Sequence, residues 1–170
     1  MTAQAAERYL TPSEIVARYL DTRPVDVDAL AQALGLVVHR DPSLSDDISG
    51  QITRAWDGSH FVIAVNARHS PQRQRFTLAH EIGHFVLHRD LIGDGLTDDA
   101  LYRGRLSTGE AFSEYRESEA NRYAADLLMP ARAMRECWRA GMRSYSEFAQ
   151  AFGVSTEAAR IRLKALGYAP

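Results

Sequence analysis

The residues whose types and spacing could do chemistry lie in the run His80-Glu81-Ile82-Gly83-His84. In an α-helix, residues four positions apart lie on the same face, so His80 and His84 can present two imidazole nitrogens to one cation. Glu81 points partly to the side, where its carboxylate can hold a water at the metal without being a ligand. This HExxH pattern is typical of zinc peptidases and predicts a metal site with Glu81 as the general base.

The alternative is that both histidines are ordinary surface or core residues that match the pattern by chance. Two features of the surrounding sequence favour the metal site. Residues 76–87 are compatible with a helix, on which Leu78, Ile82 and Phe85 form an apolar face separate from the histidines. Gly83 is costly inside a helix, but it removes a side chain between the histidines and permits close approach of another element.

A third ligand is needed, because a catalytic zinc ion usually has three protein ligands. Cys137 is the only cysteine, so this ligand should be His, Glu or Asp. Glu117 and Asn121 are four positions apart on a second helix, where the carboxylate could bind the metal while the amide orients a ligand histidine. Glu119 is the alternative to Glu117, but it lies about 200° away around the helix. An ion pair with Arg122 would explain Glu119 without a metal.

Two residues after the motif are weaker candidates. His88 continues the series of histidines, but it lies about 80° round from His80 at the helix end, which favours a capping or surface role. Asp90 occupies the third-ligand position of the longer HExxHxxGxxH/D pattern. That pattern requires glycine for a sharp turn where this chain has Leu87, so Asp90 is not favoured.

A peptidase also needs a donor for the oxyanion that develops during attack on the carbonyl. The candidates in or beside the segment 89–108 are Tyr102, Arg103, Arg105 and Tyr115. A role as ordinary surface residues explains each of them at least as well, and the sequence does not choose among them.

The elements that position these residues follow from hydrophobic periodicity and from helix start and stop signals. We expect a helix that starts at Thr11 and is broken by Pro24, followed by helices over 26–34, 72–88, 110–128, 131–140, 145–152 and 156–166. Strands are expected over 36–39, 49–55 and 61–65. Residues 89–108 lack periodicity and are expected to form a long loop. The predicted fold class is α+β, mainly helical, with a small three-stranded antiparallel sheet.

Length and composition bound the class of protein. The 170 residues, 45% hydrophobic and 25% charged, suit a globular protein with one domain and a small appendage. We expect a catalytic core over residues 1–130 and a helical extension over 131–170 that packs on it. The formal net charge of −2 argues against a generally basic nucleic-acid coat or a membrane-surface protein.

Cysteine usage and apolar runs bear on the compartment. A single cysteine excludes an internal disulfide and a multi-cysteine metal site, and it fits a reducing compartment. No apolar run is long enough to cross a bilayer, and residues 1–10 lack the pattern of a secretory signal. We therefore expect a cytoplasmic protein with no membrane partner.

The C-terminal part also has features of a helix-turn-helix. Residues 131–170 contain seven basic and three acidic residues, so this segment carries a charge of about +4, and a DNA-binding regulator is an alternative function. Arg160 and Arg162 point in different directions, however, and the last helix has few polar side chains that could contact bases. We favour a helical pair that packs on the core and helps to shape the substrate cleft.

Two sequence blocks together resemble the ImmA/IrrE family of metallo-endopeptidases. They are Arg73-Gln74-Arg75-Phe76-Thr77-Leu78-Ala79-His80-Glu81-Ile82-Gly83-His84 and Glu117-x-x-Ala120-Asn121-x-Tyr123-Ala124-Ala125-x-Leu127-Leu128-Met129-Pro130. The segments 63–66 and 148–167 also fit, so the likeness covers most of the chain. The resemblance implies a gluzincin-like core with a helix-turn-helix-like tail, His80, His84 and Glu117 as metal ligands, and Glu81 as the base.

The same resemblance implies intracellular bacterial or phage proteases that cleave helix-turn-helix repressors and so relieve repression. The expected protein is thus a zinc-dependent endopeptidase, for which Mn²⁺ or another divalent ion could also serve, and its expected partner is a helix-turn-helix repressor. Three alternatives stay open: the DNA-binding regulator, a small metal-dependent hydrolase, and the toxin of a toxin–antitoxin pair whose partner is the antitoxin. A repressor gene next to this one would favour the protease that cleaves a repressor. A small antitoxin gene without a repressor gene would favour the toxin.

Overall fold

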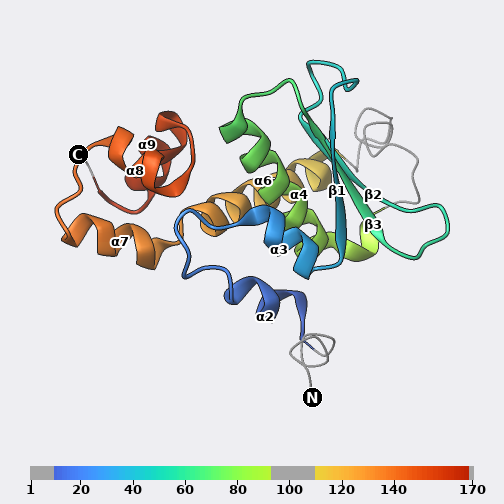
Figure 1. The fold of residues 1–170 in the computed structure, drawn as a ribbon, viewed down its shortest axis with the longest axis horizontal. Helices are drawn as coiled ribbons and strands as arrows, with labels where there is room; N and C mark the ends of the chain where they lie inside the picture. The colour runs from blue at the N-terminus through green and yellow to red at the C-terminus, as the bar shows by residue number, and fades with distance from the viewer. Residues whose placement is uncertain (1–9, 93–109, 169–170) are drawn as a thin grey trace.

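The structure, a computed structural model, describes residues 10–92 and 110–168 (Figure 1). The elements are α2 (Pro12–Ala17), α3 (Val27–Ala33), β1 (Leu36–Asp41), β2 (Gly50–Arg54), β3 (Phe61–Asn66), α4 (Pro71–His88), the short 3₁₀-helix η1 (Arg89–Leu91), α6 (Glu110–Leu128), α7 (Ala131–Arg139), α8 (Tyr145–Phe152) and α9 (Thr156–Ala165). This mainly helical α+β architecture confirms the predicted fold class. Tyr102, Arg103 and Arg105 lie outside the described residues.

Helix α2 is shorter than the sequence pattern predicts. It starts as expected at Thr11, whose side chain accepts a hydrogen bond from the N–H of Glu14 in a capping box. It ends at Ala17 rather than near Pro24. The N–H groups of Arg18 and Tyr19 donate to carbonyls three residues back, at 3.1 and 2.9 Å. Such tight i→i+3 bonds close the last turn and end an α-helix.

The sheet has the order β1-β3-β2, with β3 in the centre. Strands β2 and β3 form an antiparallel pair in which Ile52 lies opposite Ile63, whereas β1 runs parallel to β3 with Leu36 opposite Phe61. The prediction of a wholly antiparallel sheet was therefore wrong for β1. Residues 42–49 cross from the end of β1 to the far edge of the sheet, where β2 begins. The β2–β3 hairpin then places β3 next to β1, and these two strands run in the same direction. Parallel neighbours always need such a crossover.

Asn66, at the end of β3, holds this crossover in place. Its side chain is fully buried, and its Nδ2 donates to the carbonyls of Ser45 at 3.0 Å and Ile48 at 2.9 Å. Its Oδ1 accepts from the N–H of Arg68 at 3.0 Å. One side chain thus satisfies backbone groups on two segments just before β2 and just after β3.

Helix α4 is central to the fold. It packs against β2 and β3 on one side and against α6 on the other, and α3 also contacts it. Leu78 and Ile82 of α4 are fully buried, as the apolar face predicted. The helix begins at Ser70, whose hydroxyl accepts from the N–H of Arg73 at 3.3 Å, and Pro71 occupies its first turn.

Helices α7, α8 and α9 lie at one end of the molecule, beside the last turns of α6 (Figure 1). Arg162 of α9 donates to the carbonyl of Met129 at 3.0 Å and pairs with Asp126 of α6 at 2.5 Å. Arg75 of α4 donates to the carbonyl of Gly153, in the turn between α8 and α9, at 3.1 Å. These contacts tie the C-terminal helices to α4 and α6, while the domain boundary at residue 130 stays a prediction.

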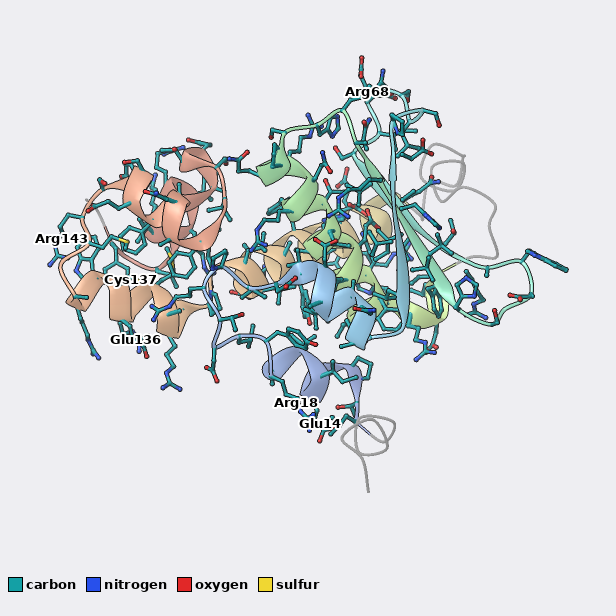
Figure 2. The ribbon with its side chains drawn as sticks, in the orientation of Figure 1. Glu14, Arg18, Arg68, Glu136, Cys137 and Arg143 are labelled. Atoms are coloured by element: carbon teal, nitrogen blue, oxygen red, sulfur yellow. The ribbon has the colours of Figure 1, made fainter. Side chains whose placement is uncertain are left out.

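Cys137, labelled on α7 in Figure 2, is buried, and its sulfur accepts a hydrogen bond from Arg23, in the segment before α3, at 3.1 Å. Over residues 10–92 and 110–168, none of the helices combines the length and apolarity that a membrane crossing requires.

Replacing Asn66 with Ala should lower the free energy of unfolding by about 2–3 kcal/mol, because it leaves buried carbonyls without donors. Urea denaturation followed by circular dichroism measures this loss. Ser43→Ala is the matched control, since Ser43 is an exposed polar residue of the same connection. It should change stability by less than about 0.5 kcal/mol. Equal effects of the two substitutions would show that Asn66 does not hold the crossover.

Candidate metal centre

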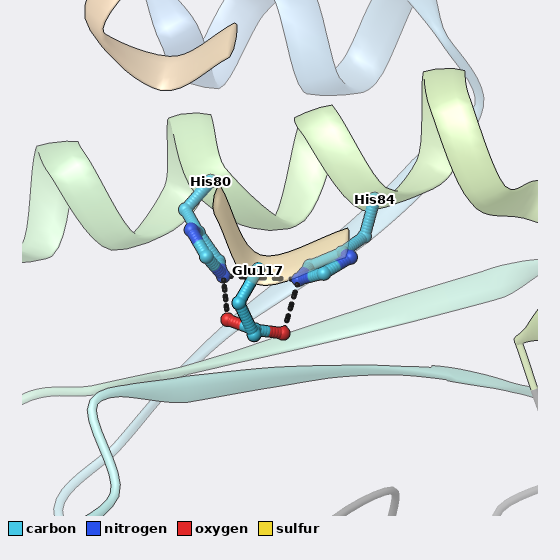
Figure 3. Close-up of side chains that lie close together, drawn as sticks. All are labelled: His80, His84 and Glu117. Carbon is cyan, nitrogen blue, oxygen red and sulfur yellow. Dashed lines mark hydrogen bonds and ion pairs between the residues drawn. The ribbon is translucent and has the colours of Figure 1, made fainter. Parts of the chain in front are cut away.

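Three side chains from two neighbouring helices meet at one point (Figure 3). His80 and His84 project from α4, and Glu117 projects from α6 between them. The two histidine Nε2 atoms lie 3.0 Å apart. Glu117 places Oε2 at 3.1 Å from Nε2 of His80 and Oε1 at 3.0 Å from Nε2 of His84. The sequence predicted these three residues as a set, and the structure brings them together.

This donor set fits a divalent transition metal. Ligand atoms about 2.0–2.1 Å from a tetrahedral zinc ion are separated from one another by about 3.3 Å, close to the spacings of the three side chains. Two imidazoles and one carboxylate are a known ligand set of catalytic zinc, in which the fourth position stays open. The cleft beside the three groups has a volume of about 280 Å³, which leaves room for that position.

Asn121 orients one of the histidines, as its spacing from Glu117 suggested. Nδ1–H of His80 donates to Oδ1 of Asn121 at 3.0 Å. In the form that binds a metal, the ring of His80 is neutral with its proton on Nδ1, so Nε2, the atom that faces Glu117 and His84, carries the lone pair. In the hydrogen bond to Glu117, Nε2 is protonated as well. Outer hydrogen bonds of this kind fix the tautomer and ring orientation of metal-binding histidines.

Gly83 allows α6 to come close enough for Glu117 to reach the histidines. A Cβ atom at Gly83 would lie 3.2 Å from Cδ1 of Tyr123 and 3.3 Å from the carbonyl oxygen of Ala120. Ala120 and Ala124 are fully buried at this contact. The close approach predicted from the glycine is therefore confirmed, and small residues on both helices make it.

Glu81 lies in the same cleft, on the side of the sheet. It is only 6% exposed and lines the cleft together with the three convergent residues and with residues 50–52 of β2. A Cβ at Gly50 would lie 3.7 Å from Oε1 of Glu81 and 2.4 Å from Cγ2 of Thr77. The absence of a side chain at Gly50 therefore lets β2 run directly beside this carboxylate.

The electrostatics of the three residues match their geometry. Burial alone would raise the pKa of Glu117, but hydrogen bonds from His80 and His84 and the charges of those rings outweigh it and hold the pKa far below its usual range. Burial alone would lower the pKa of His80, yet its bonds to Glu117 and Asn121 and the charge of Glu81 raise it. The carboxylate is thus kept ionised, as a metal ligand must be.

Other residues near the motif differ from the expectations. His88 lines the cleft, although its position suggested a capping or surface role, and its Nε2 lies 3.7 Å from Oε2 of Glu119. Glu119 thus faces His88 rather than Arg122. Arg116, which the sequence did not single out, also lines the cleft. The spacing of four residues after His84 was a signal that could have placed His88 there.

Tyr115, one of the oxyanion candidates, does not line this cleft. It is 60% exposed, and a hydrogen bond with Glu119 raises the pKa of its hydroxyl. The other oxyanion candidates, Tyr102, Arg103 and Arg105, fall in the segment 93–109, which the structure does not describe.

Comparison with known proteins gives the family. The family model described as Peptidase_M78, IrrE N-terminal-like domain, matches residues 31–164, a range that includes both helices of the site. The chain therefore belongs to this family of metallopeptidases. Membership agrees with the resemblance inferred from the two sequence blocks and implies a divalent metal.

Two similar proteins are the radiation response metalloproteases IrrE of Deinococcus deserti and Deinococcus radiodurans. The first is 43% identical over 84 residues, which cover 48% of this chain and 27% of that protein. The second is 45% identical over 78 residues, which cover 45% of this chain and 21% of that protein. The match thus spans about a quarter of each relative.

A solved structure with a similar fold is a Mycobacterium tuberculosis transcriptional regulator. The match has a TM-score of 0.63 at 21% identity and covers 94% of this chain and 48% of the regulator. At this level of identity, the likeness concerns the fold alone.

Replacing Glu117 with Gln should weaken zinc binding, because it removes a negatively charged metal ligand. Loss of an outer hydrogen-bond partner typically costs roughly 10–100-fold in metal affinity, and the loss here should be larger. Isothermal titration with Zn²⁺ measures the change. Glu119→Gln on the same helix is the matched control and should bind zinc like the unaltered chain. The reverse result would assign the third ligand to Glu119.

Replacing Gly83 with Val should force α4 and α6 apart and cost about 1–3 kcal/mol of stability through overpacking. It should also weaken zinc binding, because Glu117 would be displaced from the histidines. Leu87→Val, at an exposed position of the same helix, controls for the lower helix propensity of valine. Zinc affinity that is equal in both variants would contradict the role given to this helix contact.

Proposed function

We propose that this chain is a divalent-metal-dependent endopeptidase and that its ion is zinc. The observation that carries the proposal is the convergence of His80, His84 and Glu117 in a cleft that also contains the carboxylate of Glu81. Membership of a metallopeptidase family and the two IrrE relatives support it. If the two histidines served only to pack the core, they would not need the carboxylate of Glu81 in the open cleft beside them.

Each side chain has a distinct part in the proposed mechanism. When bound by His80, His84 and Glu117, the metal would act as a Lewis acid that makes water more acidic and polarises the peptide carbonyl. Glu81 accepts a proton from the attacking water and later passes it to the leaving nitrogen. Asn121 keeps the ring of His80 in the orientation that binding requires.

The position of β2 suggests how a peptide chain would enter the cleft. Within the part of the chain that the structure describes, β2 pairs only with β3, so its other edge is open to a further strand. Residues 50–52 of this strand line the cleft next to Glu81. An extended substrate added to the edge of β2 would be held by main-chain hydrogen bonds and would carry its peptide bonds past the carboxylate.

We propose a helix-turn-helix repressor as the substrate, in line with the resemblance to the ImmA/IrrE family. The toxin of a toxin–antitoxin pair would use the same site on a different partner. To separate them, the metal-loaded protein is incubated with repressors encoded nearby. A defined cut that a chelator abolishes supports the repressor as substrate, and intact repressors contradict it.

The rival function, sequence-specific DNA binding by the C-terminal helices, has less support. Three arginines of this segment are engaged within the chain, because Arg132 pairs with Glu136, Arg160 with Glu157 and Arg162 with Asp126. Phosphate contacts would have to compete with these pairs. A sequence-selective DNA shift at physiological salt would reverse this preference.

The variant Glu81→Gln should lose cleavage by about 10²–10⁴-fold or more while it keeps its zinc, because the base is removed and the three ligands are not. Cleavage is followed by gel electrophoresis and mass spectrometry of the products, and zinc content by elemental analysis. Glu119→Gln again serves as a control and should cut normally. Undiminished cleavage by Glu81→Gln would falsify the role of Glu81 as general base.

A further inference from the structure

A second, larger hollow lies between α9 and the catalytic helices α4 and α6, with a volume of about 690 Å³. We call it the α9 groove. Its apolar lining comes from all three helices and from the turn before α9, namely Phe76, Ala125, Met129, Val154, Ala158 and Ile161. The volume falls in the range of sites that take up several side chains or a small ligand.

Helix α9 has two apolar faces, and one of them opens into this groove. Ala159 and Leu163 are fully buried in the core. Ala158 and Ile161 are on the other face and line the groove. Ile161 is 55% exposed and lies in this hollow with the other apolar side chains of its lining.

The charges around the groove are unbalanced. Four charged side chains line it, Arg73, Arg122, Glu157 and Arg162. Glu157 is paired with Arg160, and Arg162 is paired with Asp126. Among the described residues, Arg73 and Arg122 form no ion pair, and both are exposed. The rim of the apolar groove therefore carries two arginines without an ion-pair partner among the described residues, of which Arg73 also donates a hydrogen bond to Oγ of Ser49 at 2.8 Å.

The groove adjoins the metal centre. Asn121 lines the groove, and the same side chain accepts the hydrogen bond from His80. Phe76 stands one helical turn before His80 on α4. His80 lines the cleft and its partner Asn121 lines the groove, so this bonded pair lies between the two hollows.

We propose that the α9 groove binds an apolar segment of the substrate protein that carries acidic residues beside its apolar face. This inference rests on the proposed endopeptidase function and adds the chemistry of the substrate to it. Helical grooves of this kind take up amphipathic helices, whose apolar side chains recur every three or four residues. Arg73 and Arg122 select acidic segments over basic ones, and the C-terminal helices serve substrate binding.

The test measures binding of three labelled amphipathic peptides to the chelator-treated full chain by fluorescence anisotropy. All three carry Leu on one helical face, and the other face carries Glu, Gln or Lys. We expect the Leu/Glu peptide to bind at least tenfold more tightly than the Leu/Lys peptide, with Leu/Gln between them, and the difference to shrink at high salt. Equal binding of all three peptides would overturn the proposal.

Variants locate the binding. Ile161→Asp should weaken binding of the Leu/Glu peptide at least tenfold, whereas Val37→Asp, at an exposed aliphatic residue of β1, should leave it unchanged. The double substitution Arg73→Glu and Arg122→Glu should reverse the order of the Leu/Glu and Leu/Lys peptides, because it turns two positive charges into two negative ones. A reversal cannot arise from a loss of folded protein. If neither groove variant changes the affinity for the peptides, the peptides bind elsewhere and the proposal is overturned.

These measurements separate the two proposals, because they need neither metal nor cleavage. A chain that shows the expected binding but cuts no substrate when loaded with metal contradicts the endopeptidase function, and the groove remains a docking surface. A chain that cuts its substrate but binds all three peptides with equal affinity supports the endopeptidase function and contradicts the role proposed for the groove.

Discussion

The close packing of α4 against α6 is the contact on which the site depends. Two histidines on one helix face are common, and they become a metal centre only when a third donor is held against them. Here Gly83 and Ala120 let the two helix backbones approach, and this approach brings Glu117 to both imidazoles. The sheet supports α4 from the other side, where Gly50 lets β2 lie beside Glu81. The fold thus holds four side chains from one helix pair in fixed relative positions before any ligand arrives.

The charges of the centre are arranged for a cation. A carboxylate that is only partly exposed would ordinarily lose part of its solvation, and the two imidazoles replace that solvation with directed hydrogen bonds. A divalent ion bound here would replace the ring protons of these hydrogen bonds, and the same nitrogen and oxygen atoms would face it. The hydrogen bond from His80 to Asn121 then becomes the outer support of a ligand.

Local features of the chain were predictable from the sequence, and features that depend on tertiary contacts were not. The helical spacing of His80 and His84, and the choice of Glu117 over Glu119 as the residue beside them, follow from the geometry of single helices. The parallel pairing of β1 depends on a crossover held by Asn66, which no periodicity reveals. The α9 groove likewise exists only where three helices meet, so no single segment of the sequence reveals it.

The most direct measurement of the central claim is X-ray absorption spectroscopy of the zinc-loaded chain. The account predicts four nitrogen or oxygen neighbours at about 2.0–2.1 Å, with the outer-shell scattering of two imidazole rings. A sulfur neighbour at about 2.3 Å would place the ion at Cys137 instead. That result, or a spectrum without imidazole scattering, would contradict a metal centre built from α4 and α6.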